Sequence, residues 1–380
     1  MLELRIEKVA HGGVFVARPE GKVVLVHGAL PGELVLAEVI EDARSFRRAL
    51  VRDVLEPSEH RQEHFWEAGK SYAGGADFGH IELFQQRELK ANVLAEALER
   101  MAGMKLEPQV SGVCETGLGY RSRVQLYANK AGRLGVKRLR SDDVVLVEKL
   151  PLAVSAIGDS TLLNESFPPG ERLELISDPS GKLAVRSSVG IPERLSFRGL
   201  DREFEIASDV FWQAHVAAPD VLAGEVWRQF AALEPTGDVL DLYSGAGLVA
   251  ANIAVRYVGH VTAVELSASA VRDGKRSASD LSNLSYVQSD VLGYLRSQQS
   301  IPENLVLDPP RSGAAGKVTA EIIRLRPRNI VYVACDPVAL ARDLKQFSLA
   351  GYELGDISAF DIFPQTHHFE TLVSLTLGNL

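Results

Sequence analysis

Cysteine is scarce in this chain, with only Cys114 and Cys335 among 380 residues. Two cysteines cannot build the multi-disulfide framework of a small secreted domain, so we expect a reducing, cytoplasmic setting. The sequence also lacks an apolar run long enough to span a membrane, and it begins without the basic-then-apolar pattern of a signal peptide. We therefore expect no membrane partner and two or three domains with cores of their own.

Positive charge is also in deficit, because 41 basic side chains face 50 acidic ones and the formal net charge is −9. This balance argues against a globally basic nucleic-acid binder, but it permits a local basic face. Residues 117–140 contain no acidic side chain and seven basic ones: Arg121, Arg123, Lys130, Arg133, Lys137, Arg138 and Arg140. With two tyrosines nearby, this stretch is the best candidate for an RNA-facing surface, and a merely solvated face is the alternative.

A short apolar run at 239–242 is followed at once by Gly245 and Gly247, and then by a helical pattern over 248–255. This order predicts a buried strand, a tight turn and a helix whose free N–H groups face a ligand. The same spacing fits a dinucleotide-binding turn, or a plain strand–helix turn in some other α/β domain. Asp241, at the end of the strand, would repel a pyrophosphate, so it favours a ligand that carries an ammonium and a sulfonium.

Three more acidic residues end predicted strands of this region: Glu265, Asp290 and Asp308. At the carboxyl edge of a doubly wound sheet, Glu265 can accept both ribose hydroxyls of an adenosine. Asp290 can contact an adenine amino group or, as an equal alternative, cap the helix predicted over 291–295. Asp308 opens the rigid sequence Asp-Pro-Pro-Arg at 308–311. Together with Asp241, these acids argue against a dehydrogenase.

Cys335 follows a predicted buried strand and precedes Asp336 and Pro337, which are typical of a helix N-cap and first helical position. Most lone cysteines on strands are inert core residues. At a strand's carboxyl end and a helix N-terminus, however, we expect an environment that stabilises the thiolate. Glu370 lies at the start of the last predicted strand, which would carry it to the same crevice.

The rest of the chain is predicted to form two further domains. Five short strands separated by turn residues predict an OB-like β-barrel over 1–56. Residues 57–206 predict a β-rich middle domain, in which an amphipathic helix over 85–103 is expected to pack on the catalytic domain. Residues 207–380 alternate helix and strand, as in a doubly wound α/β sheet.

Six motifs occur in the order typical of one family: Gly-Tyr-Arg-Ser-Arg (119–123), Phe-Trp-Gln (211–213), Asp-Leu-Tyr-Ser-Gly-Ala-Gly (241–247), Asp-Pro-Pro-Arg (308–311), Ala-Cys-Asp-Pro (334–337) and Phe-Pro-Gln-Thr-His-His-Phe-Glu (363–370). The chain resembles the RNA uracil-5-methyltransferases, which form ribothymidine in tRNA and 23S rRNA. The barrel, with Val-His-Gly-Ala-Leu-Pro-Gly-Glu at 26–33, resembles the TRAM domain of RNA-modifying enzymes. The resemblance covers nearly the full length and implies a class I S-adenosylmethionine-dependent methyltransferase fold.

The resemblance also implies roles for individual residues. Cys335 would add to C6 of a uridine in structured RNA, either rRNA or tRNA, and Glu370 would remove the C5 proton. The residues implied to bind S-adenosylmethionine are Gln213, Tyr243, Gly245, Glu265, Asp290 and Asp308. Arg121, Arg123, Lys137 and Arg138 are the expected RNA contacts, and we expect the protein to act as a monomer.

This sequence departs from the family pattern in two places. Many relatives carry Cys-Gly-Gly-Cys and an iron–sulfur cluster where this chain has Ala73-Gly-Gly-Ala76, and the other two ligand positions hold Glu67 and Leu150. Because such a cluster needs about four thiolates, we predict no iron–sulfur cluster and no other metal. The second departure is His215, which stands where the family has asparagine and is expected to alter contacts around the flipped base.

Two other functions remain open at this stage. RNA cytosine-5 methyltransferases commonly place a cysteine in the loop that matches 308–311, and this chain has none there. A non-catalytic RNA-binding or ribosome-assembly protein on the same fold is the other alternative, and the intact Cys335 and Glu370 argue against it.

Overall fold

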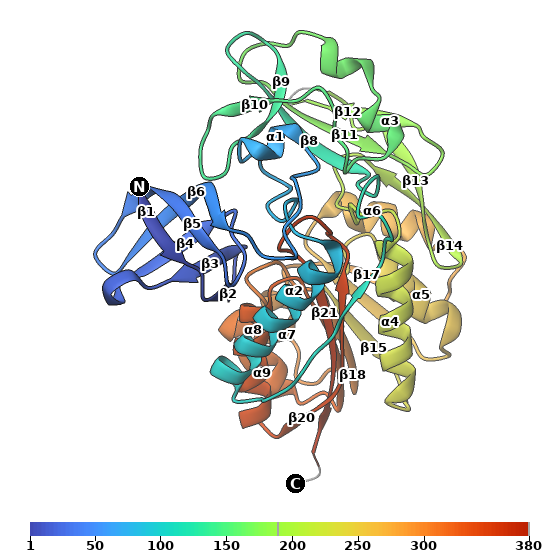
Figure 1. Cartoon of the computed structure of the whole chain (residues 1–380). Helices are drawn as coiled ribbons and strands as arrows, with labels where there is room; N and C mark the ends of the chain where they lie inside the picture. The colour runs from blue at the N-terminus through green and yellow to red at the C-terminus, as the bar shows by residue number, and fades with distance from the viewer. Residues whose placement is uncertain (188–189, 379–380) are drawn as a thin grey trace.

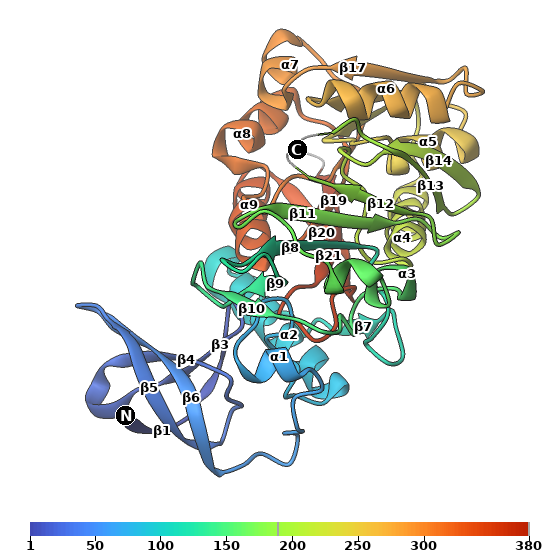
Figure 2. The ribbon, with the colours of Figure 1, turned by 90° about the horizontal axis from the view of Figure 1, so that it is seen from above.

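The computed structural model describes residues 1–187 and 190–378, so 188–189 and 379–380 of the expected middle and catalytic ranges lie outside the described residues. The chain forms three parts, an N-terminal barrel, a middle β-rich part and a C-terminal α/β part (Figures 1 and 2). Within the described ranges, none of the helices combines the length and the apolar character that crossing a membrane requires.

The N-terminal part is a six-stranded sheet in the order β1-β5-β6-β4-β3-β2. Its strands are β1 (Leu2–Arg5), β2 (Lys8–Ala10), β3 (Val14–Ala17), β4 (Val23–His27), β5 (Leu34–Asp42) and β6 (Phe46–Glu56). The sequence predicted five of them. The sixth, β2, buries only Val9, and a three-residue strand with one apolar side chain has too little alternation to be recognised.

The middle part is built on a five-stranded antiparallel sheet in the order β10-β9-β8-β11-β12. Its elements are α1 (Glu67–Lys70), β8 (Arg123–Ala128), β9 (Leu134–Lys137), β10 (Val144–Leu146), α3 (Ser155–Gly158), β11 (Arg172–Ser177) and β12 (Leu183–Arg186), with a 3₁₀ turn at Thr161–Asn164. The predicted pairing of the strand around 123–127 with that around 134–138 is confirmed.

The C-terminal part contains an eight-stranded sheet in the order β17-β16-β15-β18-β19-β21-β20-β7. Its strands are β7 (Val110–Gly112), β15 (Val239–Leu242), β16 (Val261–Glu265), β17 (Leu284–Gln288), β18 (Asn304–Leu307), β19 (Asn329–Ala334), β20 (Tyr352–Asp361) and β21 (Glu370–Leu377). Strands β15 to β19 run parallel, and β21 is antiparallel to β19. The doubly wound α/β fold is therefore confirmed.

Helices cover both faces of this sheet (Figure 1). One face packs against α4 (Ala218–Ala232), α5 (Leu248–Arg256) and α6 (Ala268–Ser277), and the other packs against α7 (Val291–Ser297), α8 (Ala315–Leu325), α9 (Pro337–Leu349) and α2 (Leu83–Ala97). A π-helical turn, Leu98–Ala102, continues α2. Leu94 and Leu98 share a core with Leu340 and Phe347 of α9, so α2 packs against the C-terminal α/β part.

The boundary expected at residue 206 is not where the structure places it. The hairpin β13 (Arg194–Gly199) and β14 (Arg202–Ala207) buries Phe197 and Phe204 in the core formed by α4, α5 and α6. Strand β7, also expected in the middle domain, is paired with β20 of the catalytic sheet. The placement of this hairpin and of β7 depends on contacts between residues far apart in the sequence, which a local sequence pattern cannot reveal.

Apolar packing fills the region where relatives are expected to hold a metal cluster. Ala73, Ala76 and Leu150 are buried in one core with Trp66, whose indole N–H donates to the carbonyl of Lys149 at 3.0 Å. Within the described residues, no group of three or more His, Cys, Asp or Glu side chains is arranged to hold a metal ion.

Candidate active site

A cavity of about 460 Å³ opens at the carboxyl ends of the central strands. It brings together five of the residues that the sequence singled out: Gln213, Tyr243, Asp308, Cys335 and Glu370. They come from the segment before α4, the loop after β15, the loop after β18 and the facing ends of β19 and β21. Residues far apart in the sequence thus line one space, as the fold predicts for this edge of a doubly wound sheet.

The two proposed catalytic side chains lie on neighbouring antiparallel strands. Ala334 of β19 is in register with Thr371 of β21, so Cys335 and Glu370 are the next residues along each strand. Both side chains line the same cavity. The sulfur and the carboxylate can therefore act on one bound molecule.

The thiol of Cys335 is protonated in the free protein, contrary to the expectation from its place at a helix N-terminus. Burial, followed by the negative charges of Glu370 and Asp308, raises its pKa to about 12, although Arg311 acts in the opposite direction. Asp336 does cap α9, as predicted, by accepting a hydrogen bond from the amide of Ala339 at 2.8 Å. Burial and the negative neighbours therefore favour the protonated form of this thiol.

The carboxylates of the cavity have perturbed pKa values as well. Burial raises the pKa of Asp308 to about 7. The pKa of Glu370 lies well above its usual range, first because of burial and then because of the negative charge of Asp308, although Arg311 acts in the opposite direction. Strong shifts of this kind, gathered in one cavity, are typical of catalytic and binding sites.

The loop after β15 has the left-handed backbone that its glycines predict. Gly245 and Gly247 have φ values of 55° and 86°, and Tyr243 adopts 62° without being glycine. A side chain at Gly247 would collide with the hydroxyl of Tyr286, since a Cβ there would lie 2.0 Å from it. The strained Tyr243 lines the cavity, and backbone strain that persists at such a position is typical of a ligand site.

Two of the other predicted cofactor residues lie at the same edge of the sheet but outside the lining of this cavity. Glu265 accepts hydrogen bonds from the amides of Gly245 at 3.0 Å and Ser267 at 2.7 Å. Asp290 caps α7 by accepting from the amide of Gly293 at 2.8 Å, which is the alternative that the sequence left open. Cap formation leaves its remaining lone pairs for a ligand.

Asp241 lies behind the glycine loop on the face of β15 that packs against α5. It is almost fully buried, and one of its carboxylate oxygens has no hydrogen-bond partner in the described part of the chain. Its pKa is raised well above the usual range by burial, then by the negative charges of Asp308 and Glu265. Three acidic groups therefore converge here.

The sequence patterns did not identify the residues that hold the segment between β20 and β21 in place. Gln86 of α2 is fully buried, accepts from the amide of Gln365 at 2.7 Å and donates to its side chain at 3.0 Å. Lys90, one turn later, forms a buried ion pair with Asp361 at 2.5 Å and donates to the carbonyl of Phe363. The sequence did contain one signal for this role, since Lys90 is spaced with the apolar face of α2, where a charged residue needs a buried partner.

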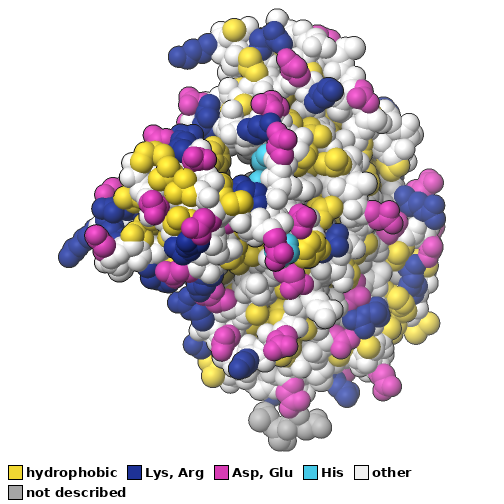
Figure 3. Space-filling view, in the orientation of Figure 1, with side chains coloured by type: hydrophobic (Ala, Val, Ile, Leu, Met, Phe, Trp, Pro, Cys, Tyr) yellow, Lys and Arg dark blue, Asp and Glu magenta, His cyan; other side chains and the backbone are white. Residues whose placement is uncertain are grey.

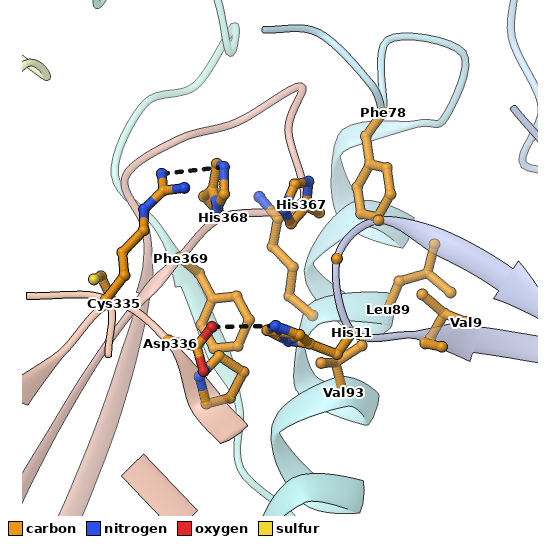
Figure 4. Close-up of a pocket in the computed structure, with 16 residues that line it drawn as sticks. Val9, His11, Phe78, Leu89, Val93, Cys335, Asp336, His367, His368 and Phe369 are labelled. Carbon is orange, nitrogen blue, oxygen red and sulfur yellow. Dashed lines mark hydrogen bonds and ion pairs between the residues drawn. The ribbon is translucent and has the colours of Figure 1, made fainter. Parts of the chain in front are cut away.

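The barrel also contacts the catalytic segment. His11 lies 3.1 Å from the carboxylate of Asp336, the residue that follows Cys335 (Figure 4). The same view shows His367 and His368 side by side, with their ring centroids 3.9 Å apart. Arg311 donates to the Nε2 atom of His368 at 3.3 Å. The barrel is therefore part of the surroundings of the site.

The predicted RNA-binding residues occupy two different environments. Lys137 and Arg138 are exposed, and Arg121 lies over the ring of Phe363 at 5.7 Å. Arg123 instead points inward, where its guanidinium donates to the carbonyls of Ser208 and Val210 at 3.2 and 2.8 Å. The structure therefore corrects the assignment of Arg123, which joins the middle part to the segment leading into the catalytic domain.

His215 was expected to alter contacts around the target base, but it lies outside the cavity lining. It is 1% exposed and stacks on Tyr120, with a centroid distance of 4.8 Å. Its Nδ1 atom accepts from the amide of Ala217 at 3.0 Å, and burial lowers its pKa to about 4. Its observed contacts are therefore with the base of α4 and with the middle part.

Comparison with family models gives two matches along the chain. Residues 1–51 match the TRAM domain, and residues 294–377 match the tRNA (Uracil-5-)-methyltransferase family. The second match includes Asp308, Cys335 and Glu370. The two matches lie at opposite ends of the sequence, in the barrel and in the catalytic sheet.

Similar proteins match over nearly the full length. An uncharacterized RNA methyltransferase of Streptomyces avermitilis is 34% identical, with 98% of this chain and 97% of that protein covered. One from Thermotoga maritima is 31% identical over the whole of both chains. The 23S rRNA (uracil(1939)-C(5))-methyltransferase RlmD of Marinomonas posidonica is 30% identical, with 97% and 94% covered.

A solved structure shares the fold over almost the whole chain. It is the Pyrococcus abyssi tRNA (uracil-54, C5)-methyltransferase in complex with S-adenosyl-L-homocysteine, which matches with a TM-score of 0.74 and 20% identity. The match covers 99% of this chain and 100% of that one. At this identity the likeness establishes the arrangement of the domains and nothing finer.

Proposed function

This chain belongs to the RNA uracil-5-methyltransferase family, and from that premise we propose that it methylates C5 of a uridine in rRNA or tRNA through a covalent adduct on Cys335. The observation that carries the proposal is the meeting of Cys335 and Glu370 in one cavity with Asp308 and Gln213. The methyl donor is S-adenosylmethionine. Membership of the family makes the chain an RNA methyltransferase. The covalent adduct on Cys335 and the choice of rRNA or tRNA are what we propose.

The charges around the cavity fit S-adenosylmethionine. Asp241 is buried near Asp308 and Glu265, and its pKa is raised first by burial and then by the negative charges of these two groups. A ligand with an ammonium and a sulfonium at this edge of the sheet would offset their combined negative charge. Tyr243, Gly245 and Asp290 complete the proposed binding set. When bound, the cofactor supplies a methyl group already activated on a positively charged sulfur.

Cys335 supplies the nucleophile that C5 of uracil requires. Its thiolate adds to C6 of the ring, and the electron pair moves onto O4 to give an enolate whose C5 carbon is nucleophilic. C5 then takes the methyl group. Because Arg311 leaves the pKa of the thiol at about 12 in the free protein, thiolate formation would require the positive charge of the bound donor to offset the nearby carboxylates.

Glu370 acts as the base in the second half of the reaction. After methylation, C5 carries both the methyl group and its original hydrogen, and the Glu370 carboxylate removes that proton. The electrons of the C5–H bond re-form the C5–C6 double bond and expel Cys335 as a thiolate. The raised pKa of Glu370 makes its carboxylate a stronger base than an exposed one.

Arg121, Lys137 and Arg138 are proposed to contact the RNA. Lys137 and Arg138 are exposed on the middle sheet, and Lys137 lies 4.9 Å from the centroid of the Tyr127 ring. Arg121 lies between that surface and the cavity, since Phe363, on which it stacks, lines the cavity. A strand of RNA that follows these side chains would deliver an unstacked uridine to Cys335.

The second cysteine does not favour cytosine methylation. Cys114 lies in the turn at 113–119, where its sulfur accepts from the amide of Gly117 at 3.2 Å. The loop at 308–311 contributes Asp308, two prolines and Arg311 to the cavity, and no thiol. A uridine mechanism, with one cysteine and one carboxylate, accounts for the residues that are present.

Trapping on 5-fluorouridine RNA tests the adduct. Fluorine at C5 cannot be removed as a proton, so the Cys335–C6 bond should persist and give a complex resistant to denaturant. Total tRNA and 23S rRNA transcripts carrying 5-fluorouridine would each be incubated with the protein and S-adenosylmethionine, then analysed by denaturing gel and peptide mass mapping.

The two cysteines provide a matched pair of variants. Cys335→Ser should give no trapped complex, whereas Cys114→Ser should trap as fully as the wild type. Trapping that is lost with Cys114→Ser and retained with Cys335→Ser would contradict the assignment. RNA binding with neither trapping nor 5-methyluridine formation would favour a binding protein.

A further inference from the structure

A second cavity, of about 340 Å³, lies where the barrel, the middle part and the segment after β20 meet. It adjoins the catalytic cavity, because Arg311 and His368 line both. The barrel contributes His27, and the segment at 64–80, with its Ala-Gly-Gly-Ala sequence, forms half of the lining. The mechanism proposed above assigns no role to His27 or to the segment at 64–80.

Three of the lining histidines, His27, His64 and His80, have lowered pKa values. Burial lowers the pKa of His27 to about 4 and that of His80 to about 3. His64 uses both nitrogens within the protein, since Nδ1 accepts from the amide of Trp66 at 3.1 Å and Nε2 donates to the carbonyl of Ala76 at 2.9 Å. Uncharged rings that donate and accept hydrogen bonds suit a neutral heterocycle better than an ion.

Two buried polar atoms of the cavity residues lack partners in the described part of the chain. They are Nε2 of His27, a residue only 4% exposed, and Nε of Arg121. Buried polar groups are nearly always hydrogen-bonded, so two such atoms in residues that line one cavity indicate a ligand that is polar where it meets them. His27 belongs to the barrel and Arg121 to the middle part, so the two unpaired atoms come from different domains.

The same cavity also has a positively charged side. Arg121 and Arg311 both line it, and Arg311 is exposed. The acid among the lining residues, Asp77, already accepts from the ring of His367 at 2.7 Å and from its amide at 3.2 Å. Two guanidinium groups beside a neutral pocket are a favourable combination for a phosphate joined to a base. Figure 3 shows histidine side chains in the hollow beside the barrel, with basic side chains next to them.

We propose that this second cavity binds another unstacked nucleotide of the same RNA, with its base against His27 and its phosphate between Arg121 and Arg311. The inference rests on the proposed function, since it presumes that a uridine occupies the adjoining cavity. A single strand whose bases are splayed apart can place two nucleotides in two adjoining pockets. The barrel would thereby select RNA sequence or shape as well as add affinity.

Photo-crosslinking tests the occupant without requiring catalysis. A pool of random 12-nucleotide RNAs that carry 4-thiouridine would be irradiated with the full-length protein and S-adenosyl-L-homocysteine, and crosslinked peptides would be mapped by mass spectrometry. We expect crosslinks within 64–80 and at His27. In His27→Leu their yield should fall about tenfold, the loss expected when one base loses its contacts.

Leu139→Trp gives an independent variant, because Leu139 is a partly exposed residue of the lining and a larger ring there should fill the cavity without disturbing the buried wall. His260→Leu serves as a control, since His260 bonds Ser285 on the far strands. Crosslinks confined to the outer surface, or unchanged in both cavity variants, would overturn the proposal. Methyl transfer to tRNA and 23S rRNA is measured in parallel, so crosslinks without methylation would reject the proposed function alone.

Discussion

At the scale of single residues, Cys335 shows how far a cavity can move a thiol from its ordinary behaviour. Arg311 does not compensate for the effect of burial and of Glu370 and Asp308 on the pKa of this thiol. A catalytic thiol that stays protonated until the methyl donor arrives is protected from oxidation and from unproductive addition. Activation of this thiol would then depend on the charge of the bound donor.

We predict that Cys335 reacts slowly with iodoacetamide in the free protein. With Cys114→Ser as background, a pKa of about 12 leaves the thiol protonated at pH 8, so the rate should be roughly 10³-fold below that of an ordinary cysteine. The rate should rise as pH increases. Glu370→Gln removes a cause of the shift and should speed alkylation, as measured by mass spectrometry over pH 7–10.

Two ligands that differ by one charge provide the comparison. S-adenosylmethionine has a sulfonium and should accelerate alkylation of Cys335 more than S-adenosyl-L-homocysteine, whose sulfur is neutral. The protein unfolded in urea should react at the ordinary rate. A fast reaction in the free folded protein, insensitive to Glu370→Gln, would show that the thiol is already ionised.

At the scale of elements, α2 determines where the segment between β20 and β21 lies. Its buried Lys90 and Gln86 bond Asp361 and Gln365, which flank the loop leading to Glu370. A buried ion pair seldom adds net stability, but it penalises any arrangement that separates its partners. The pair therefore fixes the position of the loop more than it stabilises the fold.

We predict that Lys90→Met destabilises the protein by about 3–5 kcal/mol, because it leaves Asp361 buried opposite only the more distant Arg87. Methyl transfer should fall as well, since Lys90 also bonds the carbonyl of Phe363. Urea unfolding and initial rates would measure the two effects. The double variant with Asp361→Asn should recover part of the stability.

Lys8→Met is the matched control, because Lys8 of β2 pairs with Glu96 of α2 at 2.6 Å but the two side chains are 43% and 30% exposed. Its cost should stay below about 1 kcal/mol. Equal costs for Lys90→Met and Lys8→Met would mean that the buried pair does not hold the helix to the loop.

What the sequence could predict at this scale was local. The strand, glycine turn and helix around Gly245, and the cap at Asp336, follow from residues within a few positions of one another. Arg123 was wrongly expected to contact RNA. Alternation of polar and apolar residues shows that a strand has two faces, but it does not show which face a neighbouring domain covers. The pKa of Cys335 was misjudged for a similar reason, since it depends on carboxylates from two other strands.

At the scale of the whole molecule, the barrel is closely joined to the catalytic domain. His11 contacts Asp336, and Phe78 and Leu89 contribute to the core of the barrel. Gly13, in the turn between β2 and β3, faces Asp77 and His367, so a Cβ there would lie 2.6 Å from the carboxylate and 2.8 Å from the imidazole. Contact with the barrel thus extends to the loop that precedes Glu370.

Gly13→Ala should therefore loosen the barrel from the catalytic segment and lower methyl transfer. Gly12→Ala is its control. Gly12 and Gly13 have φ values of 85° and 71°, and an alanine at either position carries left-handed backbone strain of about 1–2 kcal/mol. Only Gly13 has neighbours within 4 Å of the added carbon. Limited proteolysis of the region around 57–64 and initial rates should change for Gly13→Ala alone. If both variants lose the same activity, backbone strain suffices and the barrel does not position the active-site loop through this contact.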